Sequence, residues 1–137
     1  MFTENQTAML ESLYDGLLKV TAISVESQIK EDERELAKFG LTAEKLIEKR
    51  LPFRSGTTIY FQHKMEALIE SRKDFHWGMQ DGISVPDFLN HQNGKLESLN
   101  SNLDQLPPVE RTSTVRASFE GKMAGFVAVV SLLEEIG

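Results

Sequence analysis

The residues best suited to chemistry are a histidine and two glutamates in one stretch of helical pattern. His63, Glu66 and Glu70 stand at i, i+3 and i+7, and this spacing places three side chains on one face of a helix. Imidazole and carboxylate groups are ligands for a divalent metal, and His91 could join them from the following segment. Carboxylate-bridged di-iron bundles supply Glu-x-x-His twice, whereas this chain has His-x-x-Glu once. We therefore expect surface or helix-cap residues, with a metal site as the alternative.

Other catalytic and cofactor chemistry lacks the residues that it requires. The sequence has no cysteine, which excludes disulfides, thiolate zinc sites, iron–sulfur clusters and a cysteine nucleophile. It contains no Gly-x-Ser-x-Gly elbow and no glycine-rich phosphate loop, so a serine nucleophile and a nucleotide site are not indicated. The sequence thus favours a protein without catalytic residues or a cofactor.

A basic segment lies between two acidic ones in a chain of formal net charge −6. Such a segment could bind nucleic acid, because cations neutralise phosphates. The net charge repels polyanions at long range, however, and the basic residues can pair with the acidic helices of the same chain. We therefore expect a solvated patch or a contact with a protein partner rather than nucleic acid. The patch comprises Lys49, Arg50, Arg54, Lys64, Arg72 and Lys73.

Aromatic residues gather between residues 60 and 88. Their rings can form the apolar wall of a small-molecule pocket, while tyrosine, tryptophan and histidine supply polar tips. The alternative is that these residues belong to the hydrophobic core at the ends of helices. The candidate pocket residues are Tyr60, Phe61, Phe75, His76, Trp77 and Phe88.

Apolar residues recur at steps of three and four along most of the chain, and this spacing predicts helices. The candidate residues named above therefore lie on helices or at their ends. The first helix is predicted over 4–38, after a capping box formed by Thr3 and Gln6. Its weak point is the β-branched stretch 20–25, which could kink it. A short helix is predicted over about 43–51, between Thr42 and Pro52.

Three further helices complete the predicted set. One begins at Ser55 and runs to about Trp77, followed by a loop over 78–84. The next begins at Ser84, where serine caps and proline occupies the first turn, and it closes before Pro107. The last spans 109–136. Four long helices with a short connecting helix predict an all-α four-helix bundle that forms a single domain over 1–137.

The last predicted helix is apolar nearly all round from Met123 to Leu133. A helix of this kind either lies at the centre of a bundle or is buried by a second copy of the protein. Small residues on one side would let a neighbouring helix approach closely. The candidate interface comprises Ala117, Gly121, Met123, Ala124, Phe126, Val130 and Leu133.

The order of the helices and of four short sequence segments, over about residues 10 to 110, resembles that of a known family. After the long first helix come "GLTAEKLIEKRLPF", "FQHKMEALIES", "SVPDF" and "LNSNLDQLPP". This order resembles the four-helix bundles of the DinB-like superfamily, and the resemblance implies the same architecture. Metal-binding members of that superfamily carry three histidines, two of them four residues apart on the last helix. The last helix here has none, so the resemblance supports the architecture and weakens the expectation of a metal site.

The functional expectation follows from these patterns. No basic leader and no apolar run near ~20 residues is present, so we expect a cytoplasmic protein outside the membrane. The sequence favours a non-enzymatic interaction or regulatory protein that acts through an exposed helix face, as a homodimer or with a protein partner. The alternative is a small-ligand or metal-binding helical protein of DinB-like type that uses His63, Glu66 and Glu70.

Overall fold

The computed structural model describes residues 1–49 and 54–137, and these residues form an all-α bundle. The short connecting helix follows the first of the four long ones, so the predicted fold class is confirmed. A 3-10 turn, Pro108–Glu110, comes before the last helix. The helices are α1 (Glu4–Ala37), α2 (Ala43–Glu48), α3 (Gly56–Gln80), α4 (Val85–Gln105) and α5 (Ser113–Ile136).

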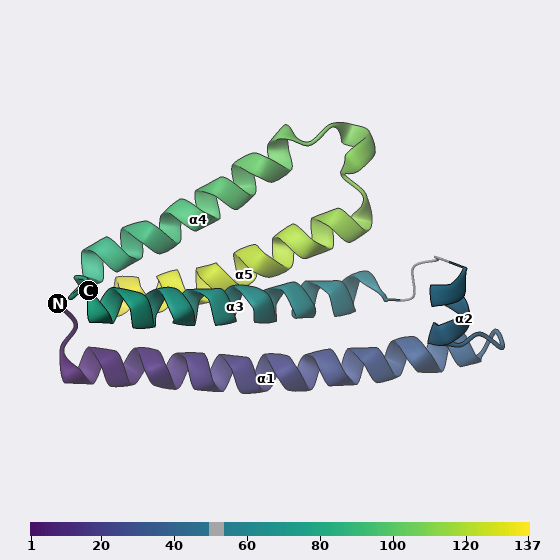
Figure 1. The fold of residues 1–137 in the computed structure, drawn as a ribbon, viewed down its shortest axis with the longest axis horizontal. Helices are drawn as coiled ribbons and strands as arrows, with labels where there is room; N and C mark the ends of the chain where they lie inside the picture. Colours follow the sequence, from purple (N-terminus) through teal and green to yellow (C-terminus); the bar gives the residue numbers. More distant parts are fainter. Residues whose placement is uncertain (50–53) are drawn as a thin grey trace.

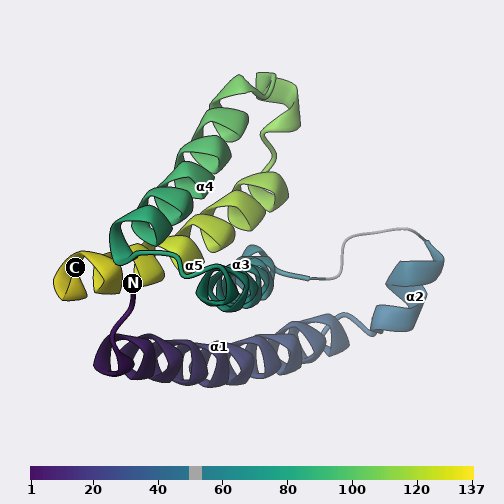
Figure 2. The same ribbon diagram turned by 60° about the vertical axis from the view of Figure 1, so that its left-hand side comes forward.

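Helix α3 lies at the centre, between α1 and α5 (Figure 1). Helix α1 runs along α3, and α4 and α5 form a hairpin that diverges from α1 (Figure 2). The contact between α3 and α5 is the most extensive in the molecule. The two chain ends lie together, where Gln6 Nε2 donates a hydrogen bond of 2.9 Å to the carbonyl of Ile136.

Two glycines on α5 allow α3 to approach so closely. A Cβ atom at Gly121 would lie 2.1 Å from the backbone oxygen of Tyr60, and one at Gly125 would lie 2.8 Å from the Cβ of Ala67. Both glycines are buried. The missing side chains thus let backbone meet backbone over the middle of the bundle.

The core is concentrated where the chain ends meet. The rings of Phe2 and Phe75 lie 5.1 Å apart, and those of Phe75 and Phe88 lie 5.6 Å apart. Tyr14 adds a fourth ring, 6.1 Å from Phe75. These rings come from the N-terminal segment, α1, α3 and α4, so one aromatic cluster holds the elements together.

Each α helix begins with a hydroxyl side chain that accepts a hydrogen bond from the backbone two or three residues into the helix. The predicted capping box of Thr3 and Gln6 is present. The predicted starts at Thr42, Ser55 and Ser84 are confirmed. Thr112 caps α5, which therefore begins four residues later than predicted.

Several predicted boundaries differ from the observed ones. Helix α1 continues unbroken through residues 20–25, so the predicted kink is absent. Helix α3 extends to Gln80 and is terminated at Gly82, whose φ of 69° is left-handed, with the Gly82 amide donating to the Met79 carbonyl and the Ile83 amide donating to the Gly78 carbonyl. Helix α2 ends at Glu48, and the predicted stop at Pro52 lies outside the described residues.

A buried carboxylate joins α1 to the start of α3. Asp32 Oδ2 accepts hydrogen bonds from the Ser55 backbone amide, at 3.1 Å, and from the Thr58 hydroxyl, at 2.6 Å. Burial opposes ionisation of Asp32, but these hydrogen bonds outweigh it and lower the pKa of the carboxyl. The ionised Asp32 therefore ties the far part of α1 to α3.

Candidate functional site

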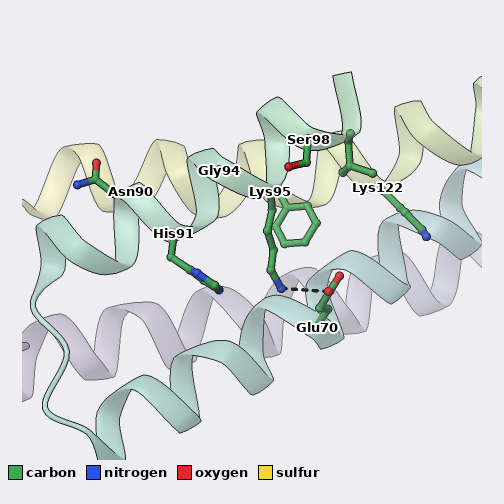
Figure 3. A pocket seen from close by; sticks show the side chains of 9 residues that line it. Glu70, Asn90, His91, Gly94, Lys95, Ser98 and Lys122 are labelled. Atoms are coloured by element: carbon green, nitrogen blue, oxygen red, sulfur yellow. Dashed lines mark hydrogen bonds and ion pairs between the residues drawn. The ribbon is translucent and has the colours of Figure 1, made fainter. Parts of the chain in front are cut away.

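A groove of about 550 Å³ opens between α4 and α5, with α3 beneath it (Figure 3). Its α4 side carries Asn90, His91, Gly94, Lys95 and Ser98. Lys122 and Phe126 line it from α5, and Glu70 lines it from α3. This volume lies within the range of small-molecule sites.

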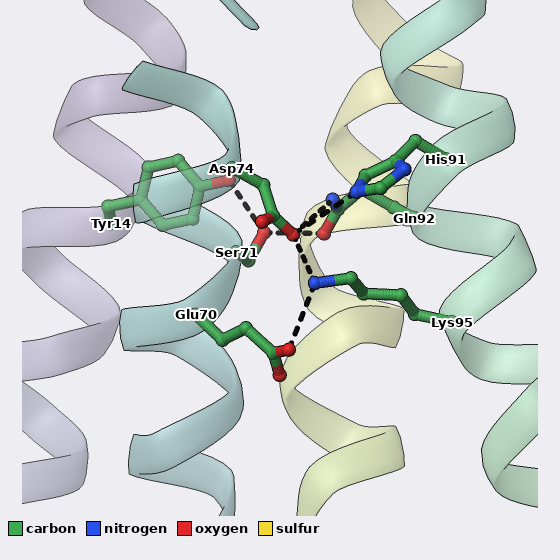
Figure 4. Close-up of polar contacts among 7 residues, drawn as sticks. All are labelled: Tyr14, Glu70, Ser71, Asp74, His91, Gln92 and Lys95. Carbon is green, nitrogen blue, oxygen red and sulfur yellow. Dashed lines mark hydrogen bonds and ion pairs between the residues drawn. The ribbon is translucent and has the colours of Figure 1, made fainter. Parts of the chain in front are cut away.

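A chain of buried hydrogen bonds stands behind the groove (Figure 4). The Ser71 hydroxyl donates to Gln92 Oε1 at 2.6 Å. The Tyr14 hydroxyl lies 2.7 Å from Ser71 Oγ, and because Ser71 donates to Gln92, Tyr14 is the donor in this bond. All three side chains are fully buried. They link α1, α3 and α4 through polar contacts inside the core.

The chain of bonds continues to Asp74, where it meets the groove. Gln92 Nε2 donates to Asp74 Oδ2 at 3.4 Å, and Lys95 Nζ donates to the same oxygen. His91 Nε2 also lies 3.4 Å from it. Lys95 Nζ makes a further bond of 3.0 Å to Glu70. Asp74 is thus surrounded by donors (Figure 4).

The protonation of two groups follows from this arrangement. Burial raises the pKa of the Tyr14 phenol, so the phenol stays neutral and donates. Burial opposes the charge of Lys95, but hydrogen bonds to Asp74 and Glu70 outweigh it and raise the pKa of the amine. A lysine that remains protonated is a poor nucleophile and a good cation. The arrangement is therefore suited to binding.

The predicted metal residues are not gathered at one point. His63 Nδ1 lies 3.2 Å from Glu66 Oε2, while Glu70 pairs with Lys95 and His91 faces Asp74. Among the residues that the structure describes, no three histidine or acidic side chains are placed to hold a metal ion. Of the four, Glu70 and His91 share the groove.

The predicted aromatic pocket is divided between the two ends of α3. Tyr60 and Phe61 lie at its beginning, with ring centroids 5.2 Å apart. Phe75 and Phe88 are fully buried in the aromatic cluster. The two remaining members face outward: His76 Nε2 lies 2.6 Å from Glu11, and Trp77 is 70% exposed.

The predicted basic patch does not form one surface. Lys64 and Lys73 are nine residues apart on α3, which places them on opposite faces of the helix. Arg72 pairs with Asp15 at 3.1 Å and with Glu11 at 3.4 Å. Arg54 is partly buried and Lys49 is exposed. Arg50 lies outside the described residues.

The residues predicted as an interface on the last helix are mostly covered within the chain. Five of the seven are buried, and the other two are partly buried. Phe126 and Leu133 are at most 1% exposed. Packing within the chain therefore covers most of these side chains, and a role of this helix in self-association stays a prediction. The buried five are Ala117, Gly121, Phe126, Val130 and Leu133.

The buried chain of hydrogen bonds was not predicted from the sequence. Ser71 stands midway between Ala67 and Phe75 on the buried face of α3, and Gln92 follows Phe88 by one turn of α4. A polar residue in an apolar stripe needs a buried partner. A polar residue within the apolar stripe of α3 and another within that of α4 could thus have indicated buried hydrogen bonds. The stripe does not say which helix supplies the partner.

Comparisons with family models, with curated proteins and with solved structures found no match to this chain. The resemblance to the DinB-like superfamily stays a prediction. Within the described ranges, no helix combines the length and the apolar character needed to cross a membrane.

Proposed function

We propose that this chain is a non-enzymatic interaction protein that associates with a second copy of itself through an exposed face of α1. The observation that carries the proposal is a stripe of uncharged residues on this helix, named here the α1 stripe. Its members Met9, Val20 and Ile23 are 49%, 62% and 58% exposed. The complete α1 stripe is Met9, Leu13, Gly16, Val20 and Ile23.

The spacing of the α1 stripe makes it one continuous surface. Steps of four and three residues keep its members within a sector of about 80° around the helix axis. Leu10, Tyr14 and Thr21, which are buried residues of α1, lie on a different sector. The apolar surface of α1 is therefore wider than the part that its own chain covers.

The α1 stripe is complementary to itself in an antiparallel arrangement. A two-fold axis at Gly16 places Met9 opposite Ile23 of the second copy, and it places Leu13 within one residue of the level of Val20. Such pairing is what a symmetric dimer requires, because each contact then occurs twice. Lys19 would lie level with Leu13 of the second copy and within one residue of Ser12, so this pairing opposes no like charge.

Gly16 supports the same arrangement. A glycine inside a helix costs about 1 kcal/mol relative to alanine, and a Cβ at this position would have no neighbour within 4 Å. No contact with the described residues of its own chain therefore calls for a glycine here. At the crossing point of two helices, a missing side chain permits close approach.

A hollow beside Met9 enlarges the surface. It measures about 460 Å³ and lies between α1 and α5. Ala8, Met9 and Leu13 line it from α1, and Leu132 lines it from α5. A side chain from a second copy could fill this space, which would bury apolar surface on both sides.

Size-exclusion chromatography with light scattering tests the association. We expect a dimer for the natural chain and a monomer for Val20→Glu, because a buried unpaired carboxylate opposes association. Glu33→Lys changes the charge on another face of α1 and serves as the control, which should stay dimeric. A natural chain that remains monomeric at every concentration would overturn the proposal.

The absence of cysteine permits a sharper test of the geometry. In Gly16→Cys, the two introduced thiols would face each other across the two-fold axis and form a disulfide under mild oxidation. Lys19→Cys places the thiol off the axis and is the matched control. Equal cross-linking of both variants would contradict antiparallel pairing at Gly16.

A further inference from the structure

The groove between α4 and α5 has a glycine in its wall that its own chain does not explain. Gly94 lies inside α4, where glycine costs about 1 kcal/mol relative to alanine. A Cβ at this position would have no neighbour within 4 Å. Gly94 lines the groove, so the missing side chain keeps volume open inside it.

The groove presents hydrogen-bond donors that have no acceptor. Lys122 is partly buried and makes no hydrogen bond or ion pair with another described residue. Lys95 has three N–H donors, of which Asp74 and Glu70 take two. Ser98 adds a hydroxyl, and Figure 3 shows it on α4 beside Lys95. These donors suit a carboxylate or a phosphate.

The acidic side chains at the groove already have hydrogen-bond partners. Glu70 is 3.0 Å from Lys95, and Asp74 Oδ2 accepts from both Lys95 and Gln92. Lys122 is therefore the lysine of the groove lining that pairs with no described carboxylate. An anion would find its charge at the end of the groove away from Asn90 and His91 (Figure 3).

The wall of the groove is fixed before any ligand arrives. The hydrogen bonds from Tyr14 through Ser71 to Gln92 hold α4 against α3. Lys95 Nζ lies 5.6 Å from the centre of the Phe126 ring, which further restrains it. Leu99 adds an apolar side chain to the lining. A preorganised site loses less entropy on binding.

We infer that this groove binds a small organic anion, with its carboxylate or phosphate at Lys122 and its apolar body in the space beside Gly94 and Leu99. The inference is independent of the α1 stripe, which lies on another helix. The recognised chemistry is an anionic group joined to a compact apolar body. Inorganic phosphate has the anionic group without the apolar body, and benzyl alcohol has an apolar body without a charge.

NMR chemical-shift titration of the labelled full chain with phenyl phosphate tests this inference. We expect saturable shifts of α4 and α5 amides that border the groove. Lys122→Gln should weaken binding about tenfold, which corresponds to about 1.4 kcal/mol. Lys122→Arg should restore it, because arginine also binds phosphate. Lys73→Gln, a change at an exposed lysine on α3, is the matched control and should bind normally.

The open space beside Gly94 is tested separately from the charge of Lys122. Gly94→Leu should abolish binding of phenyl phosphate while the circular dichroism spectrum stays helical, because the larger side chain fills the groove. Inorganic phosphate and benzyl alcohol should each bind more weakly than phenyl phosphate. Three results would each overturn the inference: no shifts at millimolar phenyl phosphate, binding retained in Gly94→Leu, or equal binding of either partial ligand. Val20→Glu should bind as the natural chain does, which separates this test from that of self-association.

Discussion

Gly121 lies directly against the backbone of Tyr60, with only 2.1 Å between the position of an added Cβ and the carbonyl oxygen of Tyr60. Backbone atoms cannot move aside as the end of a flexible side chain can. The central contact between α3 and α5 therefore depends on a glycine at this position. Gly94, in contrast, has no neighbour within 4 Å of an added Cβ, and the difference can be measured.

The same substitution should have opposite effects at two helical glycines. Gly121→Ala should lower the free energy of unfolding by about 1–3 kcal/mol or more, because the added methyl group forces α5 away from α3. Gly94→Ala should raise it by up to about 1 kcal/mol, because alanine favours the helix and its Cβ meets nothing within 4 Å. Urea unfolding of both variants checks this prediction. A similar loss of stability in both would contradict it.

The buried hydrogen bonds at Ser71 should be unequal in their contribution. Ser71→Ala leaves both Gln92 Oε1 and the Tyr14 hydroxyl without a partner and should cost about 1–3 kcal/mol. Tyr14→Phe removes the donor of one bond and leaves the bond between Ser71 and Gln92, so its cost should be about 1 kcal/mol. Thermal and urea unfolding can rank the two variants. A larger loss in Tyr14→Phe would show that the bond to Gln92 contributes little.

The pH dependence of stability on the acid side should report on Asp32. Its pKa is lower in the folded chain than the ordinary value of about 3.9 that it has on unfolding. Its contribution is therefore present above about pH 4 and is lost as the pH falls through the folded pKa. Asp32→Asn should be less stable than the natural chain near pH 7, and the difference should shrink in acid. A difference that is constant with pH would contradict a role for the ionised carboxylate.

On the alkaline side, the corresponding group is Tyr14. Its folded pKa is raised by burial above the unfolded value of about 10. Its contribution is present below about pH 10 and is lost as the pH rises toward the folded pKa, because the unfolded phenol then ionises first. The natural chain should lose more stability between pH 9 and pH 11 than Tyr14→Phe does. Parallel loss in both would indicate that other groups control alkaline unfolding.

Local signals in the sequence predicted the helices well. Caps at Thr3, Thr42, Ser55 and Ser84 act on backbone groups a few residues away, so the sequence contains both partners of each contact. The predicted end of α3 was wrong because the helix continues through Gly78 and stops at Gly82, the glycine that takes the left-handed conformation. With two glycines four residues apart, the sequence alone does not say which of them ends the helix.

The candidate site could be predicted only in part. Glu70 and His91 were selected from the sequence for metal chemistry, and both lie in the groove. Their neighbours Lys95 and Lys122 were not selected, because a lysine on a helix is most often a solvated residue. The groove is formed by the divergence of α4 from α3, which no residue pattern reports.

The one tryptophan of the chain, Trp77, is 70% exposed near the end of α3. Its indole ring is already in water when the chain is folded. Intrinsic emission is therefore a poor monitor of global unfolding, and the ellipticity of the helices is the better signal. The same exposure makes Trp77 useful in another way: an aqueous quencher such as iodide reaches it in the native state, so any molecule that covers the turn between α3 and α4 will shield its fluorescence.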